Sequence, residues 1–399
     1  MTAVRDHRPA IIDLFSGAGG FTWGWVRAGF TPLASVDNDP ASARTHELNF
    51  SNDHGLSLNK DLLKFAPEDL ADLIGHRPRG LVAIIAGPPC QGWSKVGRGK
   101  LRSLRGSEVD LLKDPRNRLY RTVLDFVSYF RPRVCVMENV PGMLSLDGAD
   151  VADDISSHFR GIGYRCSYAL VNARWFGVPQ DRQRVIFIGT RSDLPAIDAS
   201  GLGDFALNFR IGLLGLKNET TLARAIRDLP PISHGTFIEP MPYTRGSGRL
   251  SRYASIMRHG SNGMITDHIS RWHNRQDLSA FGLLTPGMLY DELPAHLKRY
   301  RDDIFKDKYK KLAWTRPAWT VTAHFAKDVY THIHPDQART ISVREAARIQ
   351  SFPDAFRFVG HMGDRFRMIG NAVPPLMAWG IAEYVKGHLA SVARGGSSG

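Results

Sequence analysis

Four short apolar runs in the first 140 positions constrain the fold more than any other feature of the sequence. They span Ile11 to Phe15, Ala34 to Asp37, Leu81 to Ala86 and Val134 to Glu138, and each ends at a polar or turn residue. Strands of a parallel sheet that is covered on both faces show this pattern, because neither face alternates with solvent. Helix-compatible stretches separate the runs. The pattern therefore predicts a doubly wound α/β domain.

The rest of the chain shows a different pattern of predicted strands and helices. "YRCSYALV" and "RVIFIGT" are predicted as a further pair of strands at a sheet edge, joined by the loop "NARWFGVPQDRQ". From about residue 191 strands become hard to assign, and from 336 helical patterns return. "SVREAARIQ" has a capping-box spacing from Ser342 to Glu345, and a closing amphipathic helix starts at proline. We expect a catalytic and cofactor domain at 1–190, a contact domain at 191–335, a returning segment at 336–393 and a flexible tail at 394–399.

The charge balance points to a polyanionic partner. Lysine and arginine number 52 against 39 aspartates and glutamates, which gives a net charge of +13. A basic surface binds and steers phosphates. "YTRGSGRLSRYASIMRH" holds four arginines and no acid, and basic residues interleaved with tyrosine suit phosphate contact and base stacking as well as a plain solvated face.

The cysteines and the apolar content exclude several classes of protein. Cys90, Cys135 and Cys166 are widely separated and form no C-x-x-C pair, which supports neither a disulfide framework nor a structural zinc site. His332 and His334 lack a third nearby ligand, so we expect surface or packing roles for them and no metal. The sequence shows no secretion signal and no run of about 18 apolar residues. We therefore expect a protein of the reducing cytoplasm.

A glycine-rich turn follows the first predicted strand. In "IIDLFSGAGGF", Gly17, Gly19 and Gly20 lie between the strand and a probable helix, where glycine lets the backbone approach a ligand. The second strand ends at Asp37, whose carboxylate is placed to accept hydrogen bonds from ribose hydroxyls. The turn predicts a nucleoside cofactor. These residues alone do not choose between a nicotinamide cofactor and S-adenosylmethionine.

Two further predicted strands bring reactive groups to the same edge of the sheet. "AGPPCQGWS" places Cys90 directly after Pro88 and Pro89, which favour an extended backbone and hold the thiol on a stiff arm suited to a nucleophile. "VCVMENVPGM" ends a strand in Glu138 and Asn139. A thiol and a carboxyl at one sheet edge are within possible reach of one substrate, an arrangement that core packing does not require.

Five motifs in order carry a resemblance to a known family. "DLFSGAGGF", "GPPCQGWS", "ENV", "PQDRQR" and "GNAVPP" closely resemble those of the bacterial DNA cytosine-5 methyltransferases, over residues 11–190 and about 314–376. Trp93 stands where that family more often has phenylalanine. The resemblance implies a Rossmann-like methyltransferase sheet with a smaller, mixed target-recognition domain, S-adenosylmethionine as cofactor, S-adenosylhomocysteine as product, and double-stranded DNA as partner.

The resemblance also implies the catalytic roles. Cys90 would attack C6 of a flipped-out cytosine, and Glu138 would protonate N3, with Asn139 positioning the loop. In "PQDRQR", Arg182 and Arg184 would hold Glu138 and contact the base carbonyl, with Gln180 as support. The base that removes the C5 proton is not named by the sequence. Residues expected to contact substrate or DNA are Gln91, Ser94, Lys95, Arg98, Asn139 and Gln180. Of these, Ser94, Lys95 and Arg98 belong to the basic, glycine-rich segment "SKVGRGKLRSLRG", which is expected to close on the phosphate backbone.

The implied cofactor residues come from several segments. Asp37 would bind the ribose and Asp61 the adenine amine, although a helix N-cap is an equally good reading of Asp61. Asn371 would close the pocket from the C-terminal side. The methionine part would be surrounded by Phe15, Ser16, Gly17, Ala18, Gly19 and Gly20, and the pocket lined by Pro88 and Leu119.

Three alternatives stay open beside a sequence-specific DNA methyltransferase. An RNA (tRNA) cytosine-5 methyltransferase shares the motifs, but the long basic region at 191–335 favours DNA. An inactive DNA-binding regulator is disfavoured because Cys90, Glu138, Arg182 and Arg184 are all present. A nicotinamide dehydrogenase is disfavoured by the prolines before Cys90 and the incomplete G-x-G-x-x-G. We expect a prokaryotic, nucleoid-associated monomer. A cognate restriction endonuclease or another defence protein as partner is left open, and so is the DNA sequence recognised.

Overall fold

The computed structural model describes residues 9–51, 55–76, 78, 80–89, 119–144, 151–243, 250–301 and 308–395. Contacts divide the chain into two compact units. Unit 1 comprises Met1–Trp175, Gln183–Phe209 and Met377–Gly399, and unit 2 comprises Phe176–Arg182 and Arg210–Leu376. These bounds differ from the domain boundaries expected at 190/191 and 335/336, because most of the returning segment packs within unit 2. The roles assigned to the two domains stay predictions.

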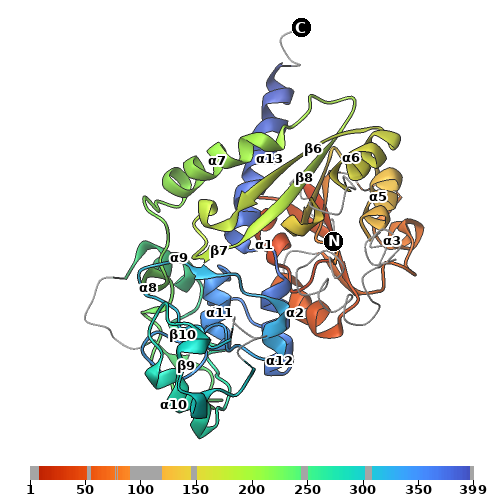
Figure 1. The fold of residues 1–399 in the computed structure, drawn as a ribbon. Helices are drawn as coiled ribbons and strands as arrows, with labels where there is room; N and C mark the ends of the chain where they lie inside the picture. Colours follow the sequence, from red (N-terminus) through yellow and green to blue (C-terminus); the bar gives the residue numbers. More distant parts are fainter. Residues whose placement is uncertain are drawn as a thin grey trace. The chain divides into compact units, whose positions relative to one another are not determined.

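Unit 1 contains a seven-stranded, mostly parallel sheet (Figure 1). The strands stand in the order β3-β2-β1-β4-β5-β8-β6, and only β8 runs antiparallel to both of its neighbours. Their bounds are β1 Ala10–Leu14, β2 Thr31–Asp37, β3 Leu56–Asn59, β4 Leu81–Ala86, β5 Val134–Asn139, β6 Tyr164–Asn172 and β8 Gln183–Arg191. The predicted α/β class and the predicted edge pair β6 and β8 are confirmed.

Helices cover both faces of this sheet. On one face α3, α5 and α6 bury apolar side chains against alternate residues of the strands, among them Ile12, Ile84 and Met137. Elsewhere in unit 1, α1 packs against the C-terminal helix α13, where a Cβ added at Gly24 would lie 2.3 Å from the Trp379 backbone nitrogen. Bounds of the unit 1 helices are α1 Gly20–Arg27, α2 Pro40–Phe50, α3 Pro67–Ile74, α5 Leu119–Phe130, α6 Val151–Gly161, α7 Leu202–Asn208 and α13 Pro375–Gly395. Short 3-10 turns are η3 Pro141–Met143, η4 Ala173–Phe176 and η5 Ala199–Gly201. As predicted, α13 starts at a proline.

Unit 2 is built from short elements. Its helices are α8 Leu222–Ile226, α9 Arg252–Arg258, α10 Arg275–Leu283, α11 Val343–Ile349 and α12 Met362–Asn371, with the π turn η6 Phe209–Leu213 at its start. Its 3-10 turns are η7 Tyr290–Glu292, η8 Ala295–Leu297 and η9 Ala323–Ala326. Two pairs of two-residue strands complete it, β7 Gln180–Asp181 with β11 Ala318–Trp319, and β9 Met241–Pro242 with β10 Met264–Ile265.

Charged side chains form part of the core of unit 2. Every residue of α11 is buried, including two arginines. Arg344 pairs with Asp267 at 2.9 Å, and Arg348 pairs with Asp354 at 2.5 Å. The predicted capping box is confirmed, since the Ser342 side chain accepts from the Glu345 amide and Glu345 Oε2 accepts from the Ser342 amide at 2.7 Å. Pairing lets these charges be buried without leaving any of them unsatisfied.

The described residues can be compared with two expectations from the sequence, one about membrane spans and one about His332 and His334. In that part of the chain, no helix combines the length and the apolar content of a membrane span. His332 and His334 are buried, and burial lowers the pKa of His332 to about 3 and of His334 to about 4. His332 Nε2 lies 3.1 Å from the Trp319 carbonyl oxygen, so this histidine hydrogen-bonds to the backbone inside the core, as a residue with a packing role does.

Candidate active site

The glycine turn after β1 contains three residues in the left-handed region of the backbone map. Phe15, Gly17 and Gly19 have φ values of 57°, 54° and 98°, and α1 begins at Gly20. A Cβ at Gly19 would lie 2.4 Å from the Phe50 ring, so this glycine is needed for close packing. A Cβ at Gly17 would meet nothing within 4 Å. The turn is therefore fixed from behind by Phe50 and open at Gly17, as a ligand cradle requires.

Asp37, at the end of β2, joins this turn to the next helix. Its Oδ2 accepts from the Gly17 amide at 2.9 Å, and its Oδ1 accepts from the Asp39 amide at 2.8 Å. Asp39 in turn caps α2 by accepting from the Ser42 amide at 3.0 Å. The predicted cofactor residues from Phe15 to Gly20 thus meet Asp37 at the carboxyl edge of the sheet, where ligands of open α/β sheets bind.

For the other predicted cofactor residues, all of them described, the structure gives burial and local contacts but no hydrogen bond to the glycine turn. Pro88 is buried after β4, and Leu119 is buried at the first position of α5. Asp61 Oδ1 accepts from the Leu63 amide at 3.1 Å within a turn, and the next helix begins only at Pro67, so this contact is not the helix N-cap expected as its alternative. Asn371 is the last residue of α12, is exposed and belongs to unit 2. The cofactor roles of these residues stay predictions.

A buried polar network of Asp13, Thr22, His46 and Ser57 lies beneath the glycine turn, and the sequence analysis did not predict it. Thr22 Oγ1 donates to Asp13 Oδ2 at 2.6 Å and lies 3.0 Å from His46 Nε2, and His46 Nδ1 lies 2.7 Å from Ser57 Oγ. Since the Thr22 proton goes to Asp13, the neutral tautomer of His46 that completes the network carries its proton on Nε2 and accepts from Ser57. Burial raises the pKa of Asp13 to about 8 and lowers that of His46 to about 3. The network holds α1 and α2 against the sheet with neutral groups.

This network predicts an unusual pH dependence of stability. The Asp13 carboxyl stays protonated up to about pH 8 in the folded state but ionises near the ordinary aspartate pKa of 3.8 when unfolded, so the unfolded state binds fewer protons between these values. The free energy of unfolding of the wild type should fall by about 1 kcal/mol between pH 6.8 and 7.8. His46 contributes little there, because its stabilisation is lost only below its unfolded pKa of about 6.5.

Urea denaturation of the wild type and of Asp13→Asn at both pH values measures this effect. The amide cannot ionise, so the variant should lack the part of the slope that Asp13 contributes. Asp125→Asn, which replaces a carboxyl on α5 with a smaller rise in pKa, serves as the matched control. Equal slopes in the wild type and Asp13→Asn would contradict the prediction.

Glu138 and Arg184 form an ion pair at the carboxyl end of β5. Glu138 is on β5, and Arg184 is on the antiparallel neighbour β8. In the register of these two strands, Glu138 of β5 is opposite Ile186 of β8. Arg184 Nε lies 2.7 Å from Glu138 Oε1, and both side chains are 11% exposed. Arg184 Nη1 also donates to the Gln183 carbonyl at 2.6 Å, which limits the movement of the guanidinium. The carboxylate is therefore held in one place while part of it stays accessible.

Asn139 connects this pair to the proline arm. The register pairs Met137 with Ala86, so β4 and β5 end side by side. Asn139 Nδ2 then donates to the Pro88 carbonyl at 3.4 Å, and Asn139 Oδ1 accepts from the Val140 amide at 2.8 Å. The structure thus brings Glu138, Arg184, Asn139 and Pro88 together. Cys90, Gln91, Ser94, Lys95 and Arg98 lie outside the described residues.

Arg182 and Gln180 have different surroundings from Arg184. Arg182 is buried in unit 2, where its Nη1 donates to the Val321 carbonyl at 2.7 Å and its Nη2 to the Gly370 and Ala372 carbonyls at 3.1 and 3.0 Å. Gln180 is also buried and bonds to Gln350 Oε1 at 2.6 Å. The described contacts give both residues a structural task within unit 2. Contact of either residue with the substrate stays a prediction.

Replacing Arg184 with lysine should lower the kcat of the methyl transfer that the resemblance implies about tenfold, and should leave the affinity for the expected cofactor, S-adenosylmethionine, unchanged. Lysine keeps the charge but cannot reproduce a guanidinium that bonds Glu138 and the Gln183 carbonyl together. Steady-state kinetics measures the effect on kcat. The matched control is Arg191→Lys, which alters an Arg–Asp pair of the same 2.7 Å length on the same strand. Similar losses in both variants would contradict a special role for Arg184.

Comparison with known proteins identifies the family to which the chain belongs. The family model for C-5 cytosine-specific DNA methylase matches residues 10–387. Type II methyltransferase M.DdeI of Desulfomicrobium norvegicum is 32% identical over 96% of this chain and 89% of its own length. Type II methyltransferase M1.HphI of Haemophilus parahaemolyticus is also 32% identical, over 94% and 86%.

A solved structure supports the fold. A prophage-encoded protein from E. coli matches with a TM-score of 0.70 and 24% identity over 96% of this chain and 99% of that one. At this identity the match bears on the fold alone. The family model and the relatives establish the rest: this chain belongs to the C-5 cytosine-specific DNA methylase family, and it is a DNA (cytosine-5-)-methyltransferase that uses S-adenosylmethionine as its methyl donor.

Proposed function

We propose that the chain methylates C5 of a cytosine flipped out of double-stranded DNA, through a covalent bond between Cys90 and C6 of the base. One observation supports this most. The Glu138 carboxylate is fixed by Arg184 at 2.7 Å, next to an arm that Asn139 ties down at Pro88. Cys90 is the second residue after Pro88 in the chain. A positioned acid beside a cysteine-bearing arm suits addition to a pyrimidine better than it suits core packing.

The residues of unit 1 fit the methyl donor. The open side of Gly17 leaves room for a ligand, and Asp37 lies beside it with its carboxylate anchored by two amides. Phe15 to Gly20 would hold the methionine part and Asp37 the ribose. When bound, S-adenosylmethionine supplies an electrophilic methyl group. The buried network of Asp13, Thr22 and His46 keeps the cradle rigid, which reduces the entropy lost on binding.

The protein groups act on the cytosine ring in a defined order. The Cys90 thiolate adds to C6, forming a carbon–sulfur bond and pushing the electrons of the C5–C6 double bond through C4 toward N3. Glu138, in the role of the acid that the resemblance implies, gives a proton to N3, which makes C5 nucleophilic. C5 would then form a bond to the methyl group while the methyl–sulfur bond of the donor breaks, which leaves S-adenosylhomocysteine. A base then removes the C5 proton, the C6–sulfur bond breaks, and N3 returns its proton to Glu138. Thiolate and carboxyl end as they began.

A cytosine inside a duplex cannot be reached in this way, so the base must leave the stack; methyltransferases are a general example of base flipping. We propose that the basic segment after Cys90, with Lys95 and Arg98, contacts the phosphate backbone during this step. Because the matched relatives are type II methyltransferases, we further propose that this chain protects the sites of a cognate restriction endonuclease.

Bisulfite sequencing tests the proposed function. The wild type is expressed in a host that lacks cytosine-5 methylation, and both its DNA and its RNA are converted and sequenced. Protection of cytosines within one short DNA sequence is expected, and it would also identify the recognition site. Protection confined to RNA would replace the proposal with an RNA methyltransferase. No protection in either, from folded protein that binds S-adenosylmethionine, would overturn it.

A further inference from the structure

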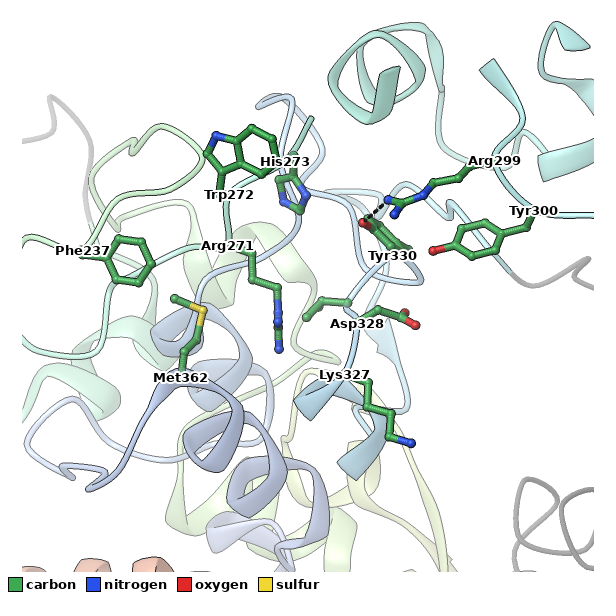
Figure 2. Close-up of a pocket in the computed structure, with 11 residues that line it drawn as sticks. Phe237, Arg271, Trp272, His273, Arg299, Tyr300, Lys327, Asp328, Tyr330 and Met362 are labelled. Carbon is green, nitrogen blue, oxygen red and sulfur yellow. Dashed lines mark hydrogen bonds between the residues drawn. The ribbon is translucent and has the colours of Figure 1, made fainter. Parts of the chain in front are cut away.

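Asp13 differs from the other buried acids of the protein. In the described part of the chain six carboxyl side chains are buried, and the five besides Asp13 each pair with an arginine: Glu138 with Arg184, Asp267 with Arg344, Asp277 with Arg299, Glu345 with Arg339 and Asp354 with Arg348. Figure 2 shows Arg299 of the Asp277 pair, with its hydrogen bond to Tyr330 dashed. Such an arginine keeps a buried carboxylate ionised. Asp13 is fully buried, and the described residues give it no cationic partner.

The hydrogen bonds of Asp13 fit a neutral carboxyl group. Its Oδ2 accepts from the Thr22 hydroxyl at 2.6 Å, and its Oδ1, among the residues described, has no hydrogen-bond partner. The titratable groups that face Asp13 or its Thr22 partner are Asp37 of β2, which has a like charge, and His46 of α2, which burial keeps neutral. Burial, opposed by the Thr22 hydrogen bond and assisted by the Asp37 carboxylate, raises the pKa of Asp13 to about 8. Near neutral pH, a positive charge close by is therefore enough to ionise a large part of it.

The network around Asp13 lies against the glycine turn that is expected to bind the methyl donor. A Cβ added at Gly19 would lie 2.8 Å from His46 Cδ2, the ring carbon bonded to Nε2, and Nε2 lies 3.0 Å from Thr22 Oγ1. Thr22 is the third residue of α1, which begins directly after Gly19. The Thr22 and His46 side chains are buried. Little solvent therefore separates Asp13 from a charge on a ligand in the turn, and that charge is weakly screened.

The methyl donor and its product differ in charge at one atom. The sulfur of S-adenosylmethionine is a sulfonium cation, and loss of the methyl group leaves S-adenosylhomocysteine with a neutral thioether. The two molecules are otherwise alike, so a cradle that only surrounds the methionine part and holds the ribose binds both of them. A group that responds to the sulfonium charge would favour the donor over the product.

We propose that Asp13 distinguishes the donor from the product by ionising in response to the sulfonium charge. When the donor enters the turn, the Asp13 carboxyl loses its proton to solvent, and the carboxylate and the sulfonium then attract each other. After methyl transfer the sulfur of the product is neutral, and Asp13 takes up a proton again. The hydrogen-bonded chain from Asp13 through Thr22 and His46 to the half-buried Ser57 offers a path for this proton. The inference rests on the proposed function, which places the methionine part of the donor at Phe15 to Gly20.

A count of protons released on ligand binding tests this role of Asp13. The full-length protein is used with the Cys90→Ser substitution, which prevents methyl transfer and removes a thiol that would itself titrate. A unit charge about 10 Å away lowers the pKa of a carboxyl in a protein by about one unit. At pH 7.5, binding of S-adenosylmethionine should therefore release about 0.5 more protons than binding of S-adenosylhomocysteine. Calorimetry in buffers with different ionisation enthalpies measures this number. The amino groups of the ligands titrate equally in Asp13→Asn, so only the excess over that variant counts.

The pH dependence of affinity gives a second measurement. In the same Cys90→Ser background, the ratio of donor affinity to product affinity should rise about eightfold between pH 6 and pH 9, because only the donor gains from ionised Asp13. Asp13→Asn should abolish this rise. Thr22→Val removes a hydroxyl that lowers the pKa of Asp13, so it should move the rise to higher pH, and Thr22→Ser should restore the original position. Asp125→Asn on α5 is the matched control and should behave like its parent.

The outcomes separate the role of Asp13 from the proposed function. An excess of protons, or a rise in the affinity ratio, that persists in Asp13→Asn would overturn the inference, and so would a flat ratio in the parent. If Asp13→Asn does not fold, the curve of Thr22→Val decides, and an unshifted curve overturns the inference. These measurements are made without DNA, so methylation by the wild type can continue whatever they show. Failure of the wild type to methylate any DNA would instead overturn the proposed function.

Discussion

A Cys90→Ser variant is expected to transfer no measurable methyl group to DNA while it still binds S-adenosylmethionine. The serine hydroxyl is slightly smaller than the thiol and fits in its place, but it ionises far less readily, so its attack on C6 is very slow. Loss of a covalent nucleophile costs on the order of 10⁴-fold or more in kcat. Transfer of tritiated methyl groups to DNA measures the rate, and binding of S-adenosylmethionine by calorimetry shows that the cradle is intact.

Cys166→Ser provides the matched control for this experiment. Cys166 is on β6, its sulfur donates to the Ser167 carbonyl at 3.8 Å, and burial holds its thiol pKa well above the usual range. Such a thiol forms little thiolate, so the control should keep the wild-type rate. A duplex with 5-fluorocytosine at the target should trap a covalent complex, because fluorine blocks the loss of a proton from C5. A trapped complex with Cys90→Ser, or a near-normal rate, would contradict the assignment.

The sequence predicts unit 1 well because its strands are read by one simple rule. A strand buried on both faces is apolar along most of its length. β4 is wholly apolar, β1 contains one polar residue, Asp13, and β5 is apolar up to Glu138 and Asn139 at its end. β3 was missed because "LSLN" at Leu56–Asn59 is short, has no apolar run, and is partly exposed. In unit 2, elements such as β9 and β11 have only two residues, so no periodicity exists to detect them. Their positions depend on tertiary contacts.

The site divides in the same way, into residues that local sequence patterns predict and residues whose surroundings depend on tertiary contacts. The turn glycines follow β1, and Asp37, Glu138 and Asn139 are at the ends of β2 and β5, positions that the sequence reveals. Sequence alone treats Arg182 and Arg184 alike, two positions apart in "PQDRQR", but only Arg184 belongs to β8 and meets Glu138 across the antiparallel register. Asp13 lies inside the predicted strand Ile11 to Phe15, and its burial and its hydrogen bond with Thr22 depend on how α1 packs.

Replacing Arg348 with alanine should lower the free energy of unfolding by about 3–5 kcal/mol. Its guanidinium is fully buried and donates to Asp354 at 2.5 and 2.6 Å, to the Ala225 carbonyl at 2.8 Å and to Asp228 at 3.1 Å. Asp228 keeps Arg258 as a partner at 2.7 Å, but Asp354 would be left with a buried charge and the Tyr243 hydroxyl. Urea denaturation followed by tryptophan fluorescence measures the loss.

The pH dependence of this loss distinguishes an uncompensated charge from a packing defect. Arg348 lowers the pKa of Asp354, so the wild type gains stability from this carboxylate above its unfolded pKa. Without Arg348, burial should raise that pKa, and protonation should then relieve part of the cost. The deficit of Arg348→Ala relative to the wild type should therefore be smaller at pH 5 than at pH 7.5. Arg275→Ala, an exposed arginine on α10, should change stability by less than about 0.5 kcal/mol at both values. A deficit for Arg348→Ala that is the same at both pH values would show that lost packing, and not the stranded carboxylate, dominates.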